Sequence, residues 1–344
     1  MSTELLQQRI QEILDDQGKE LCAAADNAAV EFVLSDAVDS FGIDLRRSPG
    51  RCRSLRYAKP SGKGWIGTVA IAKQTLSEIQ DGSLHPVVAM RNKQLEVRVA
   101  PEDLNALSTV LLLLRCERVP LSEAGAGRPP RVLSFQGLRE QFDQRDAESA
   151  PPDHPALFVG SSIFNQWSAV PEHMAPIPTI NCAFGGSRTW EVLHYMDEAV
   201  LRYQPRLVCY YCGSNDVNAG APADEIVANI KVFTERLRAA LPGTALVLCS
   251  IIRAPQKQDL WKVVDEANHG IAALSSSLEY CEYVDLNPVL ELPPAGSRQP
   301  DPDIYKEDGL HYVQEAYDTR FAPSIRPVID RLWGQLPAVA AAKL

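Results

Sequence analysis

The sequence predicts an α/β fold for residues 155–340, built on a parallel sheet with helices on both faces. Apolar runs alternate there with helical segments, and the runs are apolar almost throughout, as in strands that are buried on both faces. Strands that alternate with helices are typical of doubly wound α/β sheets. The expected strands are residues 156–160, 179–184, 206–212, 244–252 and 282–286.

Capping residues and apolar spacing define the helices between these strands. In residues 222–241, Pro222 opens the helix, apolar residues recur at three- and four-residue steps, and Pro242-Gly243 ends it. Three further helices are expected. The first begins near Thr189, the second covers about 260–277, and the third covers about 312–334.

The chain has 344 residues, more than one hydrophobic core usually serves, so we expect two domains. Stretches rich in Pro, Gly and small polar residues predict a linker with a connecting helix over residues 119–154. Residues 1–118 are expected to form a small α+β domain of unknown role, followed after the linker by the α/β domain of 155–340. Its expected helices are 3–15 and 101–116, and its expected strands are 65–72, 85–90 and 94–99.

Charge and hydropathy exclude several classes of protein. The net charge of −10 argues against binding to nucleic acid or to an anionic membrane surface. No stretch approaches the ~20 apolar residues of a membrane span. The first residues lack the basic and apolar regions of a secretory signal, so we expect a cytoplasmic protein.

The eight cysteines are scattered, and several lie inside apolar runs, as reduced buried cysteines do. Cys209 and Cys212 have CxxC spacing, but in a strand this odd offset points them to opposite faces. No second CxxC and no histidine at ligand spacing accompanies them. We therefore expect no metal or redox centre.

Residues suited to catalysis follow the predicted strands. Ser162 comes after the first strand, Gly186 after the second and Asn215 after the third, while Asp308 and His311 precede the last helix. The carboxyl ends of the strands are where reactive groups gather in such sheets. The sequence therefore predicts one site formed from these segments.

Each of these residue types suits one task in acyl transfer. The Ser162 hydroxyl is a weak nucleophile that needs a base, and an imidazole such as that of His311 can accept its proton near neutral pH. Asp308 would fix the tautomer of His311 and stabilise the imidazolium. The backbone N–H groups of Ser162 and Gly186 and the amide of Asn215 would form an oxyanion hole.

In this order and context, the residues resemble the SGNH/GDSL hydrolase superfamily. The segments LFVGSSIFNQW, INCAFGGSRTWEVLHY and YYCGSNDVNAG are similar to the branch of platelet-activating-factor acetylhydrolase catalytic subunits and bacterial GDSL esterases. The resemblance covers about residues 150–340. It implies a flavodoxin-like three-layer α/β/α sandwich with a five-stranded parallel sheet, the roles given above, and no metal or organic cofactor.

Two positions depart from the family pattern. Ser161 stands where the first block usually has Asp, and Ala183 stands where the second block commonly has Gly. Neither change removes a catalytic group. Each motif alone would be a turn or a helix cap, and it is their combination in this order that favours a catalytic site.

The predicted function is a serine esterase or lipase-like hydrolase that forms an acyl-Ser162 intermediate and prefers short acyl groups such as acetyl. The alternatives are an acyltransferase with the same intermediate, a carbohydrate O-deacetylase, and a binding module on a retired hydrolase fold. The expected partners are small-molecule, lipid or glycan esters; the oligomeric state is unknown.

Two further features have open interpretations. Trp167, Phe184 and Trp190 either line an acyl pocket or pack between helix and sheet. Residues 46–63 contain seven Arg or Lys and no acid, which is consistent with either a solvated loop or an anion-contacting surface.

Overall fold

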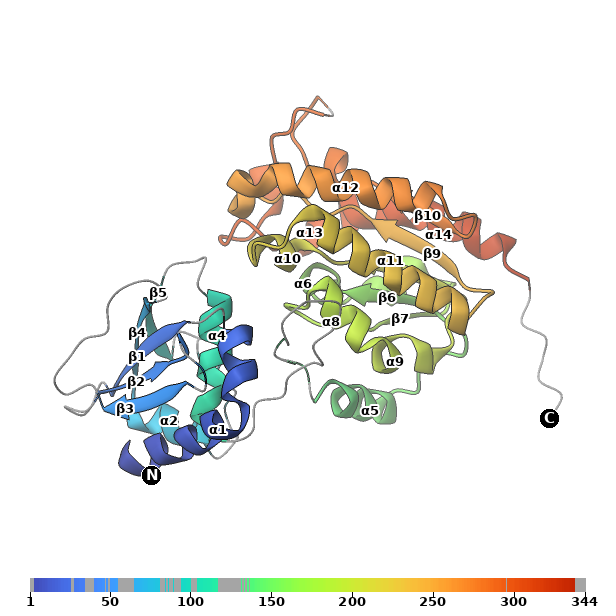
Figure 1. Cartoon of the computed structure of the whole chain (residues 1–344). Helices are drawn as coiled ribbons and strands as arrows, with labels where there is room; N and C mark the ends of the chain where they lie inside the picture. The colour runs from blue at the N-terminus through green and yellow to red at the C-terminus, as the bar shows by residue number, and fades with distance from the viewer. Residues whose placement is uncertain are drawn as a thin grey trace, which may run out of the picture. The chain divides into compact units, whose positions relative to one another are not determined.

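The computed structural model describes residues 3–25, 28–34, 40–46, 48, 50–54, 65–80, 84, 86, 89, 94–99, 104–116, 131, 133, 135, 137–294 and 296–337. Its contacts divide the chain into two compact units, Met1–Phe135 and Gln136–Leu344. Figure 1 shows a separate sheet in each unit. The limits expected from the sequence, 1–118, 119–154 and 155–340, differ from this division and stay predictions.

The sheet of the second unit has five parallel strands in the order β10-β9-β8-β6-β7. Every residue of β6, β8 and β9 is buried, which accounts for the continuous apolar runs. The predicted α/β fold is confirmed. The strands are β6 (Ala156–Gly160), β7 (Thr179–Asn181), β8 (Leu207–Tyr211), β9 (Ala245–Cys249) and β10 (Cys281–Val284).

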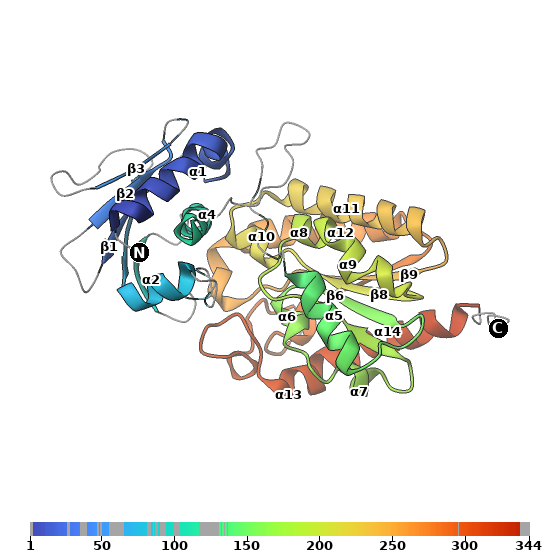
Figure 2. The ribbon, with the colours of Figure 1, turned by 90° about the horizontal axis from the view of Figure 1, so that it is seen from below.

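Helices cover both faces of this sheet, so that the unit has three layers (Figure 2). On one face Phe233 of α11 packs on Tyr210 of β8, with ring centroids 4.8 Å apart. On the other face, Ile325 and Ile329 of α14 share a core with Phe158 of β6. The first face carries α8 (Thr189–His194), α11 (Ala223–Ala240) and α12 (Trp261–Ser276), and the second carries α7 (Val170–Met174) and α14 (Ala322–Gln335).

The strand order decides where a site can form. In chain order the strands are arranged 2-1-3-4-5, and the connections diverge from between β6 and β8. Such a switch point opens a crevice at the carboxyl ends of the strands. Short elements follow the carboxyl ends of four strands: α6 (Ser162–Asn165), α10 (Ser214–Asn218), η4 (Pro255–Leu260) and η5 (Asn287–Val289). The unit also contains α9 (Met196–Ala199), η3 (Leu201–Tyr203) and η6 (Pro302–Ile304).

The helix expected over residues 312–334 is not continuous. It consists of α13 (Gln314–Ala316), the π-helix η7 (Tyr317–Phe321) and α14. In this arrangement the rings of Tyr317 and Phe321 both contact Trp167, at centroid distances of 5.7 and 6.0 Å. The packing of these rings thus accompanies the wider turn of the π-helix, which the spacing of apolar residues in the sequence does not reveal.

Helix α5 (Leu138–Glu148) lies within the segment expected to be a linker, but it is part of the second unit. Arg145 donates to the carbonyl of Asn181 at 2.9 Å and to the hydroxyl of Tyr203 at 2.7 Å. Phe142 contacts the Tyr203 ring edge-on at 6.5 Å. These contacts hold α5 beside the strand that precedes Gly186.

The first unit has a mixed sheet in the order β3-β2-β1-β4-β5, in which only β1 and β4 pair in parallel. Its apolar core lies between this sheet and the helices, which confirms the expected α+β class. The elements are α1 (Thr3–Ala24), β1 (Ala29–Leu34), β2 (Ser40–Asp44), β3 (Arg51–Ser54), β4 (Trp65–Ile71), α2 (Lys73–Gln80), β5 (Leu95–Val99), α4 (Leu104–Leu112) and η2 (Leu113–Arg115).

One expectation for this unit is wrong, and two others fall partly outside the described residues. The strand expected over 85–90 is wrong where it can be judged, because Pro86 and Ala89 are both helical. Residues 101–103 of the expected helix 101–116 are outside the described residues, as are most of residues 46–63. Within the latter, Arg46 forms an ion pair with Asp44 at 2.7 Å, so its charge is already matched.

Among the helices that the structure describes, none combines the length and the apolar character needed to cross a bilayer.

Candidate active site

The nucleophile candidate Ser162 lies at the start of α6, two residues beyond the end of β6. Gly160 has a φ of +139°, and a Cβ there would lie 1.7 Å from the carbonyl oxygen of Tyr211. The N–H of Ser161 donates to the same oxygen at 3.0 Å. Only glycine permits this close approach to β8. The turn therefore sets Ser162, partly exposed, at the carboxyl end of the sheet.

Asp308 and His311 meet Ser162 at this point, although they are far away in sequence. The Ser162 hydroxyl lies 2.9 Å from Nε2 of His311, and Nδ1 of His311 lies 2.6 Å from Oδ2 of Asp308. The carboxylate assigns the proton to Nδ1, which leaves Nε2 as the acceptor for the Ser162 hydroxyl. The structure thus brings the three predicted residues into one hydrogen-bond chain.

The turn that carries Asp308 and His311 is held by its own backbone. Gly309, with a φ of +62°, donates to the carbonyl of Lys306 at 3.0 Å. The N–H of Lys306 in turn donates to the carbonyl of His311 at 2.7 Å. The ammonium of Lys306 reaches Gln166, just after α6, at 2.8 Å. The histidine turn is therefore tied to the nucleophile helix.

Asp308 is held ionised. Burial raises the pKa of its carboxyl, but hydrogen bonds from the His311 side chain and from the backbone N–H groups of His311 and Leu310 outweigh this and lower the pKa to about 2. Those backbone bonds, of 2.9 and 3.0 Å, also fix the carboxylate orientation. Asp308 therefore stays a hydrogen-bond acceptor for His311 at any pH near neutrality.

The candidate oxyanion donors are groups of Ser162, Gly186 and Asn215. Within the described part of the chain, the N–H groups of Ser162 and Gly186 have no internal acceptor. Gly186 has a φ of +87°, a conformation that disfavours a side chain. Asn215 uses one amide hydrogen on the carbonyl of Ser187 at 2.9 Å, and its other hydrogen is available.

One carbonyl joins the loop of Gly186 to the nucleophile turn. The oxygen of Gly160 accepts hydrogen bonds from the Phe184 N–H at 2.9 Å and from the Ser187 hydroxyl at 3.0 Å. A Cβ on Gly185 would lie 3.3 Å from Oδ1 of Asn165 and 3.9 Å from Cβ of Ser162. The loop therefore lies directly against the nucleophile.

Sequence reasoning missed the role of Asp216, which is almost fully buried. Its carboxylate accepts bonds from the N–H of Thr189 at 2.9 and 3.1 Å and from its hydroxyl at 2.6 Å. Asn229 of α11 donates to that hydroxyl at 3.0 Å. Burial raises the pKa of Asp216, and the bonds from Thr189 oppose this effect. Asp216 thus anchors the start of α8, which follows the Gly186 loop.

The three aromatic residues near the motifs have different positions. Trp167 is 0% exposed and lies among aromatic rings, including that of Phe158 at 5.6 Å, so it packs in the core and lines no acyl pocket. Phe184 is also buried. Trp190 is partly exposed, and the guanidinium of Arg188 lies 5.5 Å from its ring centroid.

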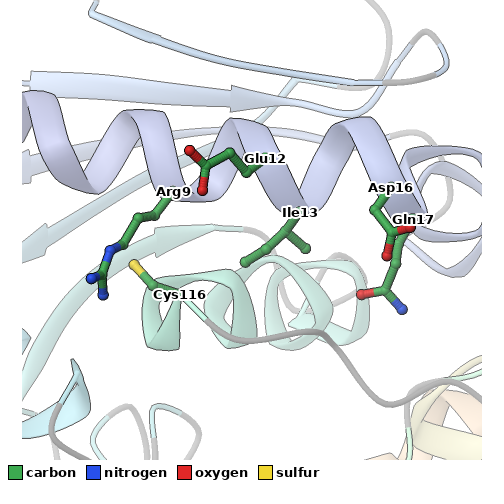
Figure 3. A pocket seen from close by; sticks show the side chains of 6 residues that line it. All are labelled: Arg9, Glu12, Ile13, Asp16, Gln17 and Cys116. Carbon is green, nitrogen blue, oxygen red and sulfur yellow. The ribbon is translucent and has the colours of Figure 1, made fainter.

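A pocket of about 420 Å³ lies in the first unit rather than at this site. Figure 3 shows that its wall comes mainly from α1, with Cys116 beyond η2 on the other side. Its lining contains none of the predicted site residues, so the chemistry of the triad, not cavity size, marks the candidate active site. Among the described residues, no cluster of three or more His, Cys, Asp or Glu side chains is arranged to hold a metal ion.

Residues 158–319 match the model of the GDSL-like lipase/acylhydrolase family. The matched residues lie within the second unit, and we call this part of the chain the GDSL-like domain. The GDSL-like domain is therefore an ester-hydrolysing serine hydrolase, as the motifs predict. A comparison with curated proteins finds no match.

Solved structures similar to this chain include three hydrolases. A GDSL-like lipase from Bacteroides thetaiotaomicron is 22% identical, with a TM-score of 0.49, over 56% of this chain and 97% of that one. A carbohydrate esterase family 3 protein from Talaromyces cellulolyticus is 18% identical, with a TM-score of 0.42, over 53% and 100%. A lipase/acylhydrolase from Enterococcus faecalis is 18% identical, with a TM-score of 0.42, over 54% and 100%.

Proposed function

We propose that the GDSL-like domain hydrolyses carboxylic esters through an acyl-enzyme formed on Ser162. The observation that carries this proposal is the hydrogen-bond chain from Ser162 through His311 to Asp308, with atom separations of 2.9 and 2.6 Å. A base within hydrogen-bond reach of a hydroxyl, and itself oriented by a third group, is the arrangement that activates a serine.

In the first half of the reaction, Oγ of Ser162 attacks the ester carbonyl carbon while Nε2 of His311 takes the hydroxyl proton. Asp308 stabilises the imidazolium that results. The negatively charged tetrahedral oxygen accepts hydrogen bonds from the N–H groups of Ser162 and Gly186 and from the second amide hydrogen of Asn215. The C–O bond to the alcohol then breaks, and Nε2 of His311 protonates the departing oxygen.

In the second half, water takes the place of the alcohol. The water oxygen attacks the acyl carbon while His311 accepts a proton from the water. The bond between the acyl carbon and the Ser162 oxygen then breaks. The Ser162 oxygen regains a proton from His311, and the carboxylic acid leaves. The same donors serve both tetrahedral intermediates.

We propose a short acyl group, such as acetyl. The space next to Ser162 is bounded by the backbone of Gly185 and by Asn165, since a Cβ on Gly185 would be 3.3 Å from the Asn165 amide oxygen. Trp167 and Phe184 are buried and offer no apolar wall for a long chain. These observations support a small acyl-binding site that is bordered by polar groups.

The test is hydrolysis of p-nitrophenyl esters from acetyl to palmitoyl by wild type and by Ser162→Ala. We expect the highest kcat/KM on acetyl and a loss of about 10⁴-fold or more in the Ser162→Ala variant, because no other nucleophile accompanies His311. A fluorophosphonate probe, which reacts with an activated serine, should label the wild type and not the variant. Equal hydrolysis by both proteins would refute the acyl-Ser162 mechanism.

Three outcomes would change the proposed function. If added alcohol or amine acceptors capture most of the acyl group, the domain is an acyltransferase. If acetylated glycans are cleaved far faster than p-nitrophenyl acetate, it is a carbohydrate O-deacetylase. A folded wild type that neither hydrolyses esters nor takes the label would instead be a binding module.

A further inference from the structure

A buried lysine lies next to the catalytic turn and has no place in the mechanism above. Lys257, in the 3₁₀ helix η4 that follows β9, is only 2% exposed. Its ammonium donates to the side-chain oxygen of Gln256 at 3.2 Å. Within the described part of the chain, no carboxylate lies at ion-pair distance from it. A buried ammonium without such a partner is costly and rare in a folded domain.

The backbone next to Lys257 packs directly on the turn of Asp308. The N–H of Gln256 donates to the carbonyl of Gly309 at 3.1 Å. A Cβ on Gly309 would lie 3.4 Å from the Gln256 nitrogen and 3.5 Å from Cβ of Pro255. Segment 255–257 is therefore a supporting surface for the acid of the triad.

The side chain of Gln256 extends this support to the oxyanion helix. Its Oε1 accepts from Lys257 and also from Nδ2 of Asn218, at 3.2 Å in each case. Asn218 is the last residue of α10, the helix that contains Asn215. Lys257 thus fixes a glutamine that contacts both the Asp308 turn and the helix of the oxyanion donor.

The electrostatic surroundings of Lys257 are dominated by Asp308. Burial lowers the pKa of Lys257 to about 8, and the charge of Asp308 acts in the opposite direction. Other charged groups of the elements packed on η4 are engaged elsewhere: Asp216 with Thr189, Asp265 with Arg253 and Arg298, Lys262 with Glu266, and Lys306 with Gln166. The remaining ones, Asp259, His269 and Glu307, are exposed and screened by solvent.

We propose that Lys257 is a positioning residue of the esterase: it clamps Gln256 between the Asp308 turn and α10, and its buried charge disfavours protonation of His311. The inference rests on the proposed function. Because Lys257 is buried, water screens its charge less than that of an exposed lysine. The carboxylate that it interacts with, Asp308, lies 2.6 Å from Nδ1 of His311. Lys257 therefore keeps the base unprotonated, and the enzyme active, at lower pH than the Asp308 carboxylate alone would allow.

The test is the pH dependence of kcat/KM on p-nitrophenyl acetate for Lys257→Met and Lys257→Gln. We expect the midpoint of the acid limb to move up by about half a pH unit or more in both variants, because the repulsion of the His311 imidazolium is removed. Lys262→Met removes the same charge from an 87% exposed side chain on α12 and should leave the midpoint unchanged.

Melting curves confirm that each variant is folded, and the use of two neutral replacements guards against a failure of one to fold. An unmoved midpoint in a folded Lys257 variant would overturn the inference, even if kcat falls evenly at every pH. The Ser162→Ala enzyme separates this failure from that of the proposed function. If its hydrolysis persists, the ester-hydrolase site itself is refuted, whereas Ser162-dependent activity with an unmoved midpoint refutes the role of Lys257 alone.

Discussion

Gly160 shows how little freedom the residues around the nucleophile have. Its φ of +139° and its close approach to the Tyr211 carbonyl leave no room for a Cβ, while its own oxygen accepts two hydrogen bonds from the Gly186 loop. A single glycine therefore sets the distance between the nucleophile and the oxyanion donors. The Gly-Ser-Ser segment predicts a turn, but the two bonds to its carbonyl depend on a loop more than twenty residues away.

Glu191 is a second residue whose environment has a measurable consequence. It is 1% exposed, and one carboxylate oxygen accepts from the N–H of Arg188 at 2.9 Å while the other has no partner among the described residues. Burial raises the pKa of Glu191 from 4.5 to about 7, although Arg188 opposes this. The folded protein therefore binds more protons than the unfolded chain between these two pH values.

From this we predict that stability falls as pH rises from about 4.5 to about 7 and that Glu191→Gln removes this loss, since the amide carries no charge to bury. Urea unfolding should show a gain of about 3 kcal/mol for Glu191→Gln at pH 9 and little difference at pH 4. Glu235→Gln, on an exposed face of α11, is the matched control. A gain at pH 9 no larger than that of the control would contradict the assignment.

At the scale of elements, the start of α8 is fixed by a residue from another helix. Asp216 of α10 accepts three hydrogen bonds from Thr189, the first residue of α8. The Gly186 loop lies between β7 and α8, so its end is anchored by the residue that follows the oxyanion candidate Asn215. The positions of the Gly186 and Asn215 donors thus both depend on the contact between Asp216 and Thr189.

We expect Asp216→Ala to lower the free energy of unfolding by about 3 kcal/mol, because it leaves the buried N–H and hydroxyl of Thr189 without their acceptor. It should also lower kcat more than it raises KM, since the displaced donors act mainly in the transition state. Chemical unfolding and steady-state kinetics measure the two effects. As a control, Asp153→Ala removes an exposed carboxylate and should change neither the free energy of unfolding nor the kinetics. An effect of Asp216→Ala on KM alone would argue against a role in positioning the oxyanion donors.

The elements differ in how well the sequence predicts them, for physical reasons. Strands such as β8 are buried on both faces and read as continuous apolar runs. In contrast, β1 contains the buried Glu31, and β3 has only four residues, so their patterns are ambiguous. The π-turn at Tyr317 depends on contacts with Trp167, which no local pattern encodes.

The candidate site was predictable to a similar extent. Ser162, Asp308 and His311 follow recognisable local patterns, and the structure brings them into contact. Lys257 and Asp216 carry no such signal, because their importance comes from burial and from partners such as Asn218 and Thr189 in other segments. Such tertiary neighbours are invisible before the chain is folded.

At the scale of the whole molecule, the site and its supporting contacts belong to one unit. The hydrogen bonds of Ser162, His311, Asp216 and Lys257 all lie within Gln136–Leu344, which has its own core. The first unit has a separate core and a separate sheet. Among the described residues, it supplies none of the proposed catalytic atoms.

We therefore predict that residues 136–344 alone hydrolyse p-nitrophenyl acetate with a kcat/KM within about threefold of the whole chain, because a compact unit with its own core folds independently. The same fragment with Ser162→Ala is the control and should be inactive. Circular dichroism and a melting curve establish that the fragment is folded. A folded fragment that neither takes the fluorophosphonate label nor turns over would show that the first unit contributes to the reaction.

The two partners of the central hydrogen bond, Ser162 and His311, are separated by 149 positions along the chain. A ribosome thus makes the hydroxyl long before the imidazole. Until the later segment leaves the exit tunnel and docks, the serine is an ordinary alcohol. A chain that stops before residue 311 therefore lacks the base that activates the serine.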